Sequence, residues 1–191
     1  GYIYVTWGDG RSGDSDVYFA KSLDGGFTWT SPNIKVNDSA GGWQVGPCHT
    51  LDSSGNIYAA WQDSRVAGDQ DIYFAKSTDG GSTWTDPNIE ITDPQSWAAL
   101  LGSLELDTQR RIYVVWADER TLDFDVYFAK SVNGGATWTD PNIRVNPSTA
   151  GDQDWADIAV DLPGNLYVVY DDVAPIWFTK STDGGLTWTE P

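Results

Sequence analysis

The sequence predicts an all-β protein, a β-propeller with about four blades of four antiparallel strands each. Three observations lead to this fold class. An eight-residue motif occurs four times, and its copies start 55, 54 and 50 residues apart. Two runs of β-branched and aromatic residues of strand length precede each copy. Finally, a repeat of about 50 residues with room for four strands has the size of a propeller blade.

The octet is the most regular part of the repeat and reads Ser-x-Asp-Gly-Gly-x-Thr-Trp, with Asn133 in place of aspartate in the third copy. It spans residues 22–29, 77–84, 131–138 and 181–188. Aspartate or asparagine accepts hydrogen bonds from turn amides, and glycine supplies positive φ. The tryptophan can pack between neighbouring blades. We therefore interpret the octets as structural turns and assign no catalytic role to Asp24, Asp79 or Asp183.

The strands are expected in the same order in every repeat. The second strand of each blade is the run at 2–7, 56–61, 111–116 or 165–170, and the third is at 16–21, 71–76, 125–130 or 175–180. An outer strand follows Pro32, Pro87 or Pro141, where an edge strand tolerates proline. A short inner strand between repeats, such as 103–107 or 157–161, completes the blade.

This order places the blades at about 1–37, 38–92, 93–146 and 147–191. The first blade then has no inner strand, and the last has no outer strand. We expect the chain to be part of a larger ring, or a half that forms a homodimer, with a closed ring of four blades as the alternative. An unpaired inner edge would otherwise favour aggregation.

The chain is strongly acidic, with 28 Asp and Glu against 11 Lys and Arg and a net charge of −17. Such a surface repels phosphate backbones and anionic membranes, so nucleic acid is not expected as a partner. No apolar stretch approaches the roughly 20 residues that span a bilayer, so no membrane insertion is expected. A single cysteine, Cys48, excludes an intrachain disulfide. No cofactor is predicted, although carboxylates such as Asp14 and Asp16 could bind calcium.

Functional residues are expected where the repeat does not require them. The loops after three second strands share the pattern Trp-x-Asp-x-Arg. Its candidate ligand-binding residues are Asp9 and Arg11, Asp63 and Arg65, and Asp118 and Arg120. Guanidinium groups from adjacent blades could bind a carboxylate or sulfate. The alternative is an Asp–Arg pair that fastens each loop to its neighbour.

The loops between blades each contain a tryptophan, namely Trp43, Trp97 and Trp155. Exposed indoles are good platforms for sugar rings, and the irregular placement of these tryptophans in the repeat argues against a purely structural role. Tryptophans that fill the space between blades are the alternative.

The octet resembles the Asp-box, or bacterial neuraminidase repeat, of sialidases and many other secreted propellers. The resemblance covers essentially the whole chain and implies a propeller in a secreted or cell-surface protein. It also implies that the candidate loops lie on the face opposite the octets, which is the ligand face in related propellers. It does not fix an activity, because Asp-boxes also occur in endoglucanase-like hydrolases, lectins, sorting receptors and assembly factors.

A sialidase-like enzyme would need three arginines, a Tyr–Glu nucleophile pair and an Asp acid/base. The arginines are available, but Glu105 is the one glutamate that stands out from the repeat, and the Arg-Ile-Pro signature is absent. The single histidine, His49, does not support a Ser–His–Asp triad. We therefore expect a secreted, non-catalytic propeller that binds glycans or proteins. A sialidase-like glycoside hydrolase, or a scaffold segment of a larger protein, is the alternative.

Overall fold

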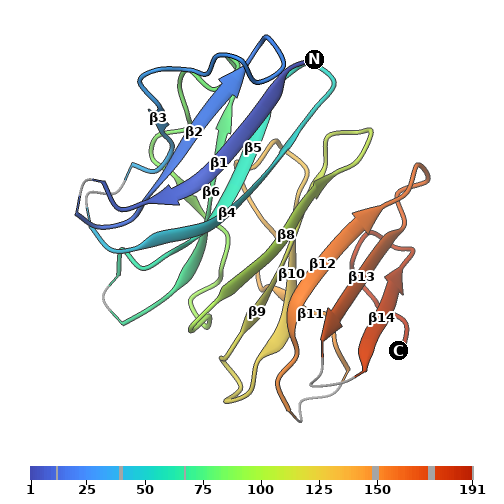
Figure 1. Ribbon diagram of the computed structural model, residues 1–191. Helices are drawn as coiled ribbons and strands as arrows, with labels where there is room; N and C mark the ends of the chain where they lie inside the picture. Colours follow the sequence, from blue (N-terminus) through green and yellow to red (C-terminus); the bar gives the residue numbers. More distant parts are fainter. Residues whose placement is uncertain (12, 39–40, 67, 148–150, 172–174, 191) are drawn as a thin grey trace.

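A computed structural model describes residues 1–11, 13–38, 41–66, 68–147, 151–171 and 175–190. Within these ranges the chain forms strands, turns and irregular segments but no helix. The strands build four antiparallel sheets that follow one another in an open arc, with the two termini at its opposite ends (Figure 1). This confirms the predicted all-β propeller architecture.

The four sheets follow the chain. Sheet 1 contains β1 (Ile3–Asp9), β2 (Asp16–Ser22) and β3 (Ile34–Lys35). Sheet 2 contains β4 (Gln44–Leu51), β5 (Ile57–Asp63), β6 (Asp71–Ser77) and β7 (Ile89–Glu90). Sheet 3 contains β8 (Leu100–Leu106), β9 (Ile112–Asp118), β10 (Asp125–Ser131) and β11 (Ile143–Arg144). Sheet 4 contains β12 (Asp154–Val160), β13 (Leu166–Asp171) and β14 (Ile176–Ser181). As the sequence predicts, sheet 1 starts with a second strand and the described part of sheet 4 ends with a third strand.

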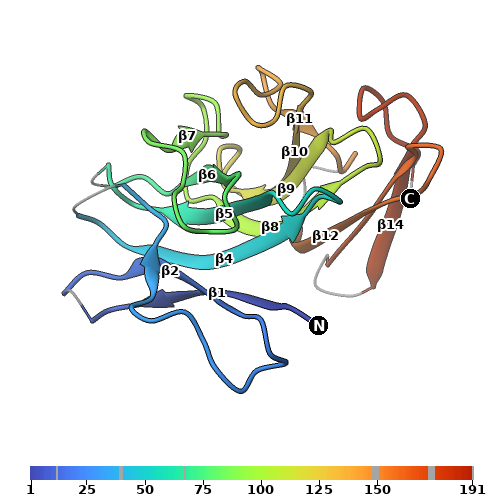
Figure 2. The same cartoon turned by 90° about the horizontal axis from the view of Figure 1, so that it is seen from above.

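The inner strands β4, β8 and β12 lie next to one another along one side of the arc, and the short outer strands β7 and β11 lie on the other (Figure 2). The inner strands start three residues earlier than the sequence predicts, at Leu100 for β8 and Asp154 for β12. The reason is a bulge near the start of each strand, between Leu101 and Ser103 in β8 and between Asp154 and Asp157 in β12. A bulge interrupts the alternation of inward and outward residues, so the sequence pattern ends before the strand does.

The hydrophobic core is divided among the junctions between sheets. Separate buried clusters lie between sheets 1 and 2, between sheets 2 and 3, and between sheets 3 and 4. In each junction the octet tryptophan of one sheet packs edge-on against a phenylalanine of the preceding sheet. The pairs are Phe19–Trp84, Phe74–Trp138 and Phe128–Trp188, with ring centroids 5.5, 5.2 and 5.4 Å apart. The predicted packing of the octet tryptophans between blades is therefore confirmed.

Hydrogen bonds within the octet explain its residue types. In the first copy, the Asp24 carboxylate accepts from the amide of Thr28 at 2.9 Å and from its hydroxyl at 2.6 Å. These bonds lower the pKa of Asp24. The Ser22 hydroxyl accepts from the amide of Gly26 at 2.7 Å. In the third copy, Asn133 accepts from the amide of Thr137 at 3.0 Å, so asparagine preserves the turn.

One acidic pair distinguishes sheet 2 from its neighbours. The carboxylate at the start of the third strand has a cationic partner on the outer strand in sheet 1, where Lys35 Nζ lies 2.7 Å from Asp16 Oδ1. In sheet 2 the corresponding residues are Asp71 and Glu90. Burial, and to a smaller extent the negative charge of Glu90, raises the pKa of Asp71 from 3.8 to about 6.

Replacing Glu90 with lysine is therefore expected to stabilise the protein at pH 7. The raised pKa means that folded Asp71 binds its proton more tightly than unfolded Asp71 does, so ionisation lowers stability as pH rises from about 4 to 6. A lysine near Asp71 would remove part of this loss, on the order of 1 kcal/mol at pH 7 and less at pH 4. Urea unfolding of the wild type and of Glu90→Lys at both pH values measures this gain in the free energy of unfolding. The exposed substitution Glu190→Lys, with the same change of net charge, is the control, and an equal gain in both variants would contradict the prediction.

Candidate functional site

The two ends of the strands carry different kinds of loop. The octets connect β2, β6 and β10 to the outer strands and follow β14 at the same end. The Trp-x-Asp-x-Arg loops and the crossings between sheets lie at the opposite end, which we call the loop end. This separation follows from antiparallel pairing within each sheet and agrees with the expected placement of the candidate residues.

The three Asp–Arg pairs form within their own loops. In sheet 3, the Asp118 carboxylate is fully buried and accepts from Trp116 Nε1 at 3.3 Å, from the Arg120 guanidinium at 2.7 Å and from the Arg120 amide at 2.9 Å. In sheet 2, Asp63 makes the corresponding bonds to Trp61 and Arg65. Asp9 makes them in sheet 1, to Trp7 and Arg11.

Each guanidinium lies against the outer half of its sheet. Arg65 and Arg120 stack on tyrosines of the third strands, 3.8 Å from the ring centroids. Arg120 also binds both carboxylate oxygens of Asp93, at 3.0 and 3.1 Å, in the segment that crosses from sheet 2 to sheet 3. Arg65 binds Asp38 at 2.9 Å in the preceding crossing. These contacts fasten the crossings between sheets, and the geometry therefore favours the structural role for the arginines.

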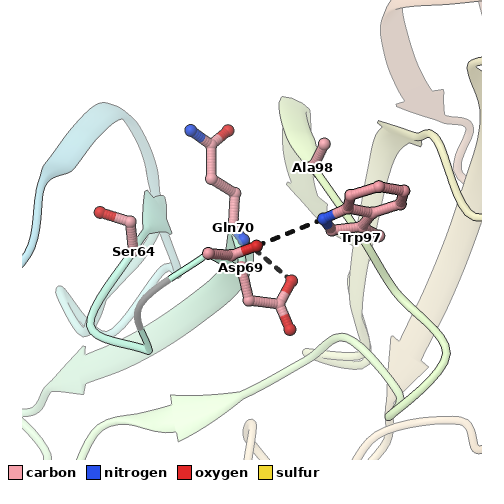
Figure 3. A pocket seen from close by; sticks show the side chains of 6 residues that line it. Ser64, Asp69, Gln70, Trp97 and Ala98 are labelled. Atoms are coloured by element: carbon pink, nitrogen blue, oxygen red, sulfur yellow. Dashed lines mark hydrogen bonds between the residues drawn. The ribbon is translucent and has the colours of Figure 1, made fainter.

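Trp97 lines a cavity of about 290 Å³ at the loop end, between sheets 2 and 3. Its indole Nε1 donates to the carbonyl of Gly68 at 3.3 Å, and Ser64, Asp69, Gln70 and Ala98 complete the lining (Figure 3). The indole is 55% exposed. Trp97 therefore contributes one wall of an open cavity, although its own N–H is already engaged.

Trp43 and Trp97 make the same backbone contact despite their irregular spacing in the sequence. The carbonyl of Trp43 accepts from the amide of Ser64, and that of Trp97 accepts from the amide of Glu119. Ser64 and Glu119 each follow the buried aspartate of their loop. A common scaffold contact thus accounts for the backbone of two of the three tryptophans. Trp43 itself is exposed and lines neither this cavity nor the next one.

Trp155 lies on the inner strand β12 and is 84% exposed. It occupies the bulge of β12 with φ of 48°, where the bulge of β4 has Gly46 with φ of 57°. Positive φ is unfavourable for a bulky residue. Together with Asp154, Gln62, Leu100 and Leu101 it lines a cavity of about 250 Å³. This cavity combines an exposed indole, two leucines, a carboxylate and an amide.

The two polar side chains of this cavity differ in their surroundings. Gln62 Nε2 donates to the carbonyl of Ala99 at 3.1 Å, which fixes the side chain of Gln62. Burial, and then the negative charges of Asp171 and Asp152, raises the pKa of Asp154. Gly102 allows β12 to approach β8, because a Cβ added there would lie 2.2 Å from the carbonyl oxygen of Ala156.

Further along the same inner strands, Glu105 of β8 and Asp157 of β12 carry two more carboxylates. The pKa of Glu105 is raised, mainly by burial and also by the charge of Asp157. In the pairing register, Glu105 corresponds to Thr50 and Ala159 of the other inner strands, as the sequence comparison of the repeats indicates. The inner strands β8 and β12 thus each carry a further acidic side chain.

Several lining residues are not among the candidates that the sequence provides. Gln62, Leu100 and Leu101 were missed because they belong to runs that also read as ordinary strand or crossing residues. Gln62 could have been found from its variation within the repeat. The same register position is occupied by Gly8, Ala117 and Asp171 in the other three sheets. A position that varies within a regular repeat is a candidate for function.

Calcium binding stays a prediction. Within the described ranges, no group of three His, Cys, Asp or Glu side chains is placed to hold a metal ion.

The described part of the chain contains no helix long and apolar enough to cross a membrane.

Comparisons with known proteins support the fold. No protein-family model matches the sequence, and no curated protein matches it either. Among solved structures, a protein of unknown function from Dyadobacter fermentans is 19% identical with a TM-score of 0.73, and the match covers 100% of this chain and 65% of that one. An ulvan lyase of polysaccharide lyase family PL25, bound to -[GlcA(1-4)Rha3S]-, is 17% identical with a TM-score of 0.73, covering 100% and 52%. The NanB sialidase of Streptococcus pneumoniae is 11% identical with a TM-score of 0.67, covering 100% and 49%.

At these identities the matches show a shared fold. The chain spans about half to two thirds of the length of these solved proteins. It is thus similar to a large part of each of them.

Proposed function

We propose that this chain is a glycan-binding propeller segment that holds a neutral sugar ring against Trp155 without cleaving it. The observation that carries the proposal is the Trp155 indole, which is 84% exposed beside the cavity of about 250 Å³. Its backbone φ of 48° costs a bulky residue roughly 1–2 kcal/mol. The fold does not require a bulky residue at this position, because the equivalent position in the bulge of β4 is a glycine, which adopts positive φ without this penalty.

The cavity offers both kinds of contact that a sugar needs. The indole and the leucines provide apolar surface for the C–H face of a ring. The Asp154 carboxylate and the Gln62 side-chain oxygen can accept hydrogen bonds from hydroxyl groups. A sugar-binding site typically combines such apolar walls with a few fixed polar groups.

Electrostatics favour a neutral sugar over a uronic, sialic or sulfated one. The described lining residues include no lysine or arginine, and Asp154 contributes a negative charge. Glu105, Asp157 and the net charge of −17 add to the repulsion of anions. The named structural neighbours support carbohydrate as the ligand class, since they include a polysaccharide lyase and a sialidase. The resemblance of the octets to Asp-boxes adds a secreted or cell-surface location to the proposal.

Calorimetric titration with neutral and acidic oligosaccharides tests the proposal. Trp155→Ala is expected to weaken binding of a neutral oligosaccharide about tenfold, the effect of losing roughly 1.4 kcal/mol of stacking. Trp43→Ala removes another exposed indole at the loop end and is the matched control, expected to leave the affinity unchanged. Equal affinities of the wild type and Trp155→Ala, or binding of acidic sugars only, would reject the proposal.

The same mixtures decide between binding and catalysis. Glu105 and Asp157 favour the hydrolase alternative, because glycoside hydrolysis uses two carboxylates on either side of the scissile bond. We expect the oligosaccharides to remain intact after long incubation. Cleavage that disappears in Glu105→Gln would replace the binding proposal with a glycoside hydrolase.

A further inference from the structure

The two cavities at the loop end, which we call the Trp97 cavity and the Trp155 cavity, are lined in part by the same short segment. Trp97 and Ala98 contribute to the first cavity. Leu100 and Leu101, which follow after one further residue, contribute to the second. The two cavities are therefore separated by only a few residues of one crossing between sheets.

The residue between the two cavities is Ala99, whose backbone binds a wall residue of each. Its amide donates to the carbonyl of Gln70, which lines the Trp97 cavity, at 2.9 Å. Its carbonyl accepts from Nε2 of Gln62, which lines the Trp155 cavity, at 3.1 Å. Ala99 itself is fully buried. One buried peptide unit thus fixes the two cavities relative to each other.

Each cavity is small on its own. Their volumes are about 290 and 250 Å³, below the roughly 300–1,000 Å³ of a typical small-molecule site. The chain from Trp97 to Leu101 spans at most about 14 Å, a distance that a few linked sugar rings bridge. The sizes and the separation therefore suit successive units of one chain-like ligand better than two independent small molecules.

The Trp97 cavity offers contacts similar to those of the Trp155 cavity. The exposed indole of Trp97 provides apolar surface for the C–H face of a ring, and its Nε1 is already engaged by the carbonyl of Gly68. The Gln70 amide and the Asp69 carboxylate can bind hydroxyl groups (Figure 3). The described lining contains no lysine or arginine. This cavity therefore also favours a neutral sugar over an anionic one.

We propose that the ligand is a linear neutral oligosaccharide that places one unit against Trp155 and a later unit against Trp97. This inference rests on the proposed function, because it takes the Trp155 cavity as the first subsite. A ligand that reaches both cavities gains the second contact without a second loss of translational freedom. Affinity should therefore rise with the length of the oligosaccharide.

Calorimetric titration with cello-, manno- and xylo-oligosaccharides of increasing length tests the inference. In a series that binds, the longest member is expected to bind the wild type about tenfold more tightly than the disaccharide. Trp97→Ala is expected to remove this gain and to leave the affinity for the disaccharide unchanged. Trp155→Ala should weaken binding at every length, whereas Trp43→Ala is the control that changes neither.

A second variant separates lost contacts from a disturbed loop. Gln70→Ala shortens an exposed side chain and leaves in place the backbone carbonyl that the Ala99 amide binds. It is expected to weaken the binding of the long members only, in the same direction as Trp97→Ala. Circular dichroism checks that both variants keep the β-sheet structure of the wild type.

The outcomes separate this inference from the proposed function. Affinity that does not depend on length, or a Trp97→Ala variant that affects all members equally or none of them, would overturn the second subsite. If Trp155→Ala still weakens binding in that case, the proposed function stands with a single subsite. An unchanged affinity of Trp155→Ala rejects the proposed function itself, and a wild type that binds none of the three series overturns both.

Discussion

Asp118→Ala is expected to lower the free energy of unfolding by about 3–5 kcal/mol, the cost of breaking a buried ion pair. The Asp118 carboxylate is fully buried and accepts five hydrogen bonds from Trp116, Ser96, Trp97 and Arg120. Its removal leaves the Arg120 guanidinium, which is nearly buried, with Asp93 as its one charged partner among the described residues. It also releases the amide of Trp97, so the cavity in Figure 3 should lose one fixed wall.

Asp9→Ala is the matched control for this substitution. Asp9 has the same role in sheet 1, but its side chain is 23% exposed and that of Arg11 is 46% exposed. An exposed ion pair contributes little to stability, so the expected loss is much smaller than that of Asp118→Ala. Urea unfolding followed by tryptophan fluorescence compares the two variants. Similar losses of stability in the two variants would contradict our interpretation, because they would show that the contribution of the Asp–Arg pair to stability does not depend on its burial.

Gly135→Ala is expected to be similarly harmful, for a steric reason. A Cβ at Gly135 would lie 2.0 Å from Cε1 of Phe74, and the glycine has φ of 92°. The equivalent Gly26 has φ of 97° but meets only Ile3 Cδ1, at 3.5 Å. The two substitutions therefore share the backbone penalty and differ in the clash.

Gly26→Ala should cost about 1–2 kcal/mol, the penalty of left-handed backbone. Gly135→Ala should cost at least about 2 kcal/mol more, because Phe74 or the octet must move. Chemical denaturation of the two variants separates these contributions. If both lose the same stability, the close packing of octet on phenylalanine is not a major source of stability.

The fold could be predicted from the sequence because every blade repeats the same octet and the same strand pattern. Four octets, each with an acceptor, two glycines and a tryptophan, leave few alternatives to a turn that packs on the neighbouring sheet. The bulges of β8 and β12 were not predicted, since a bulge breaks the alternation from which strands are read. The first residues of these two strands could therefore be identified only in the structure.

The candidate site was predicted only in part. Trp97 and Trp155 do line cavities at the loop end, but the residues opposite them come from other sheets. Gln62 and Leu101 line the same cavity as Trp155 because the curvature of the arc brings β5, β8 and β12 together. The same limit applies to the arginines, whose direction toward the outer strands depends on side-chain stacking that no spacing reveals.

The division of the hydrophobic core among junctions has a consequence for how the protein can change. A chain without a shared centre behaves as a one-dimensional array, in which each unit is coupled mainly to its nearest neighbours. The effect of a substitution should then fade within about one unit on either side. Evolution can accordingly rewrite the loops of one sheet, as the bulge with Trp155 illustrates, while the neighbouring sheets keep their sequence and their fit.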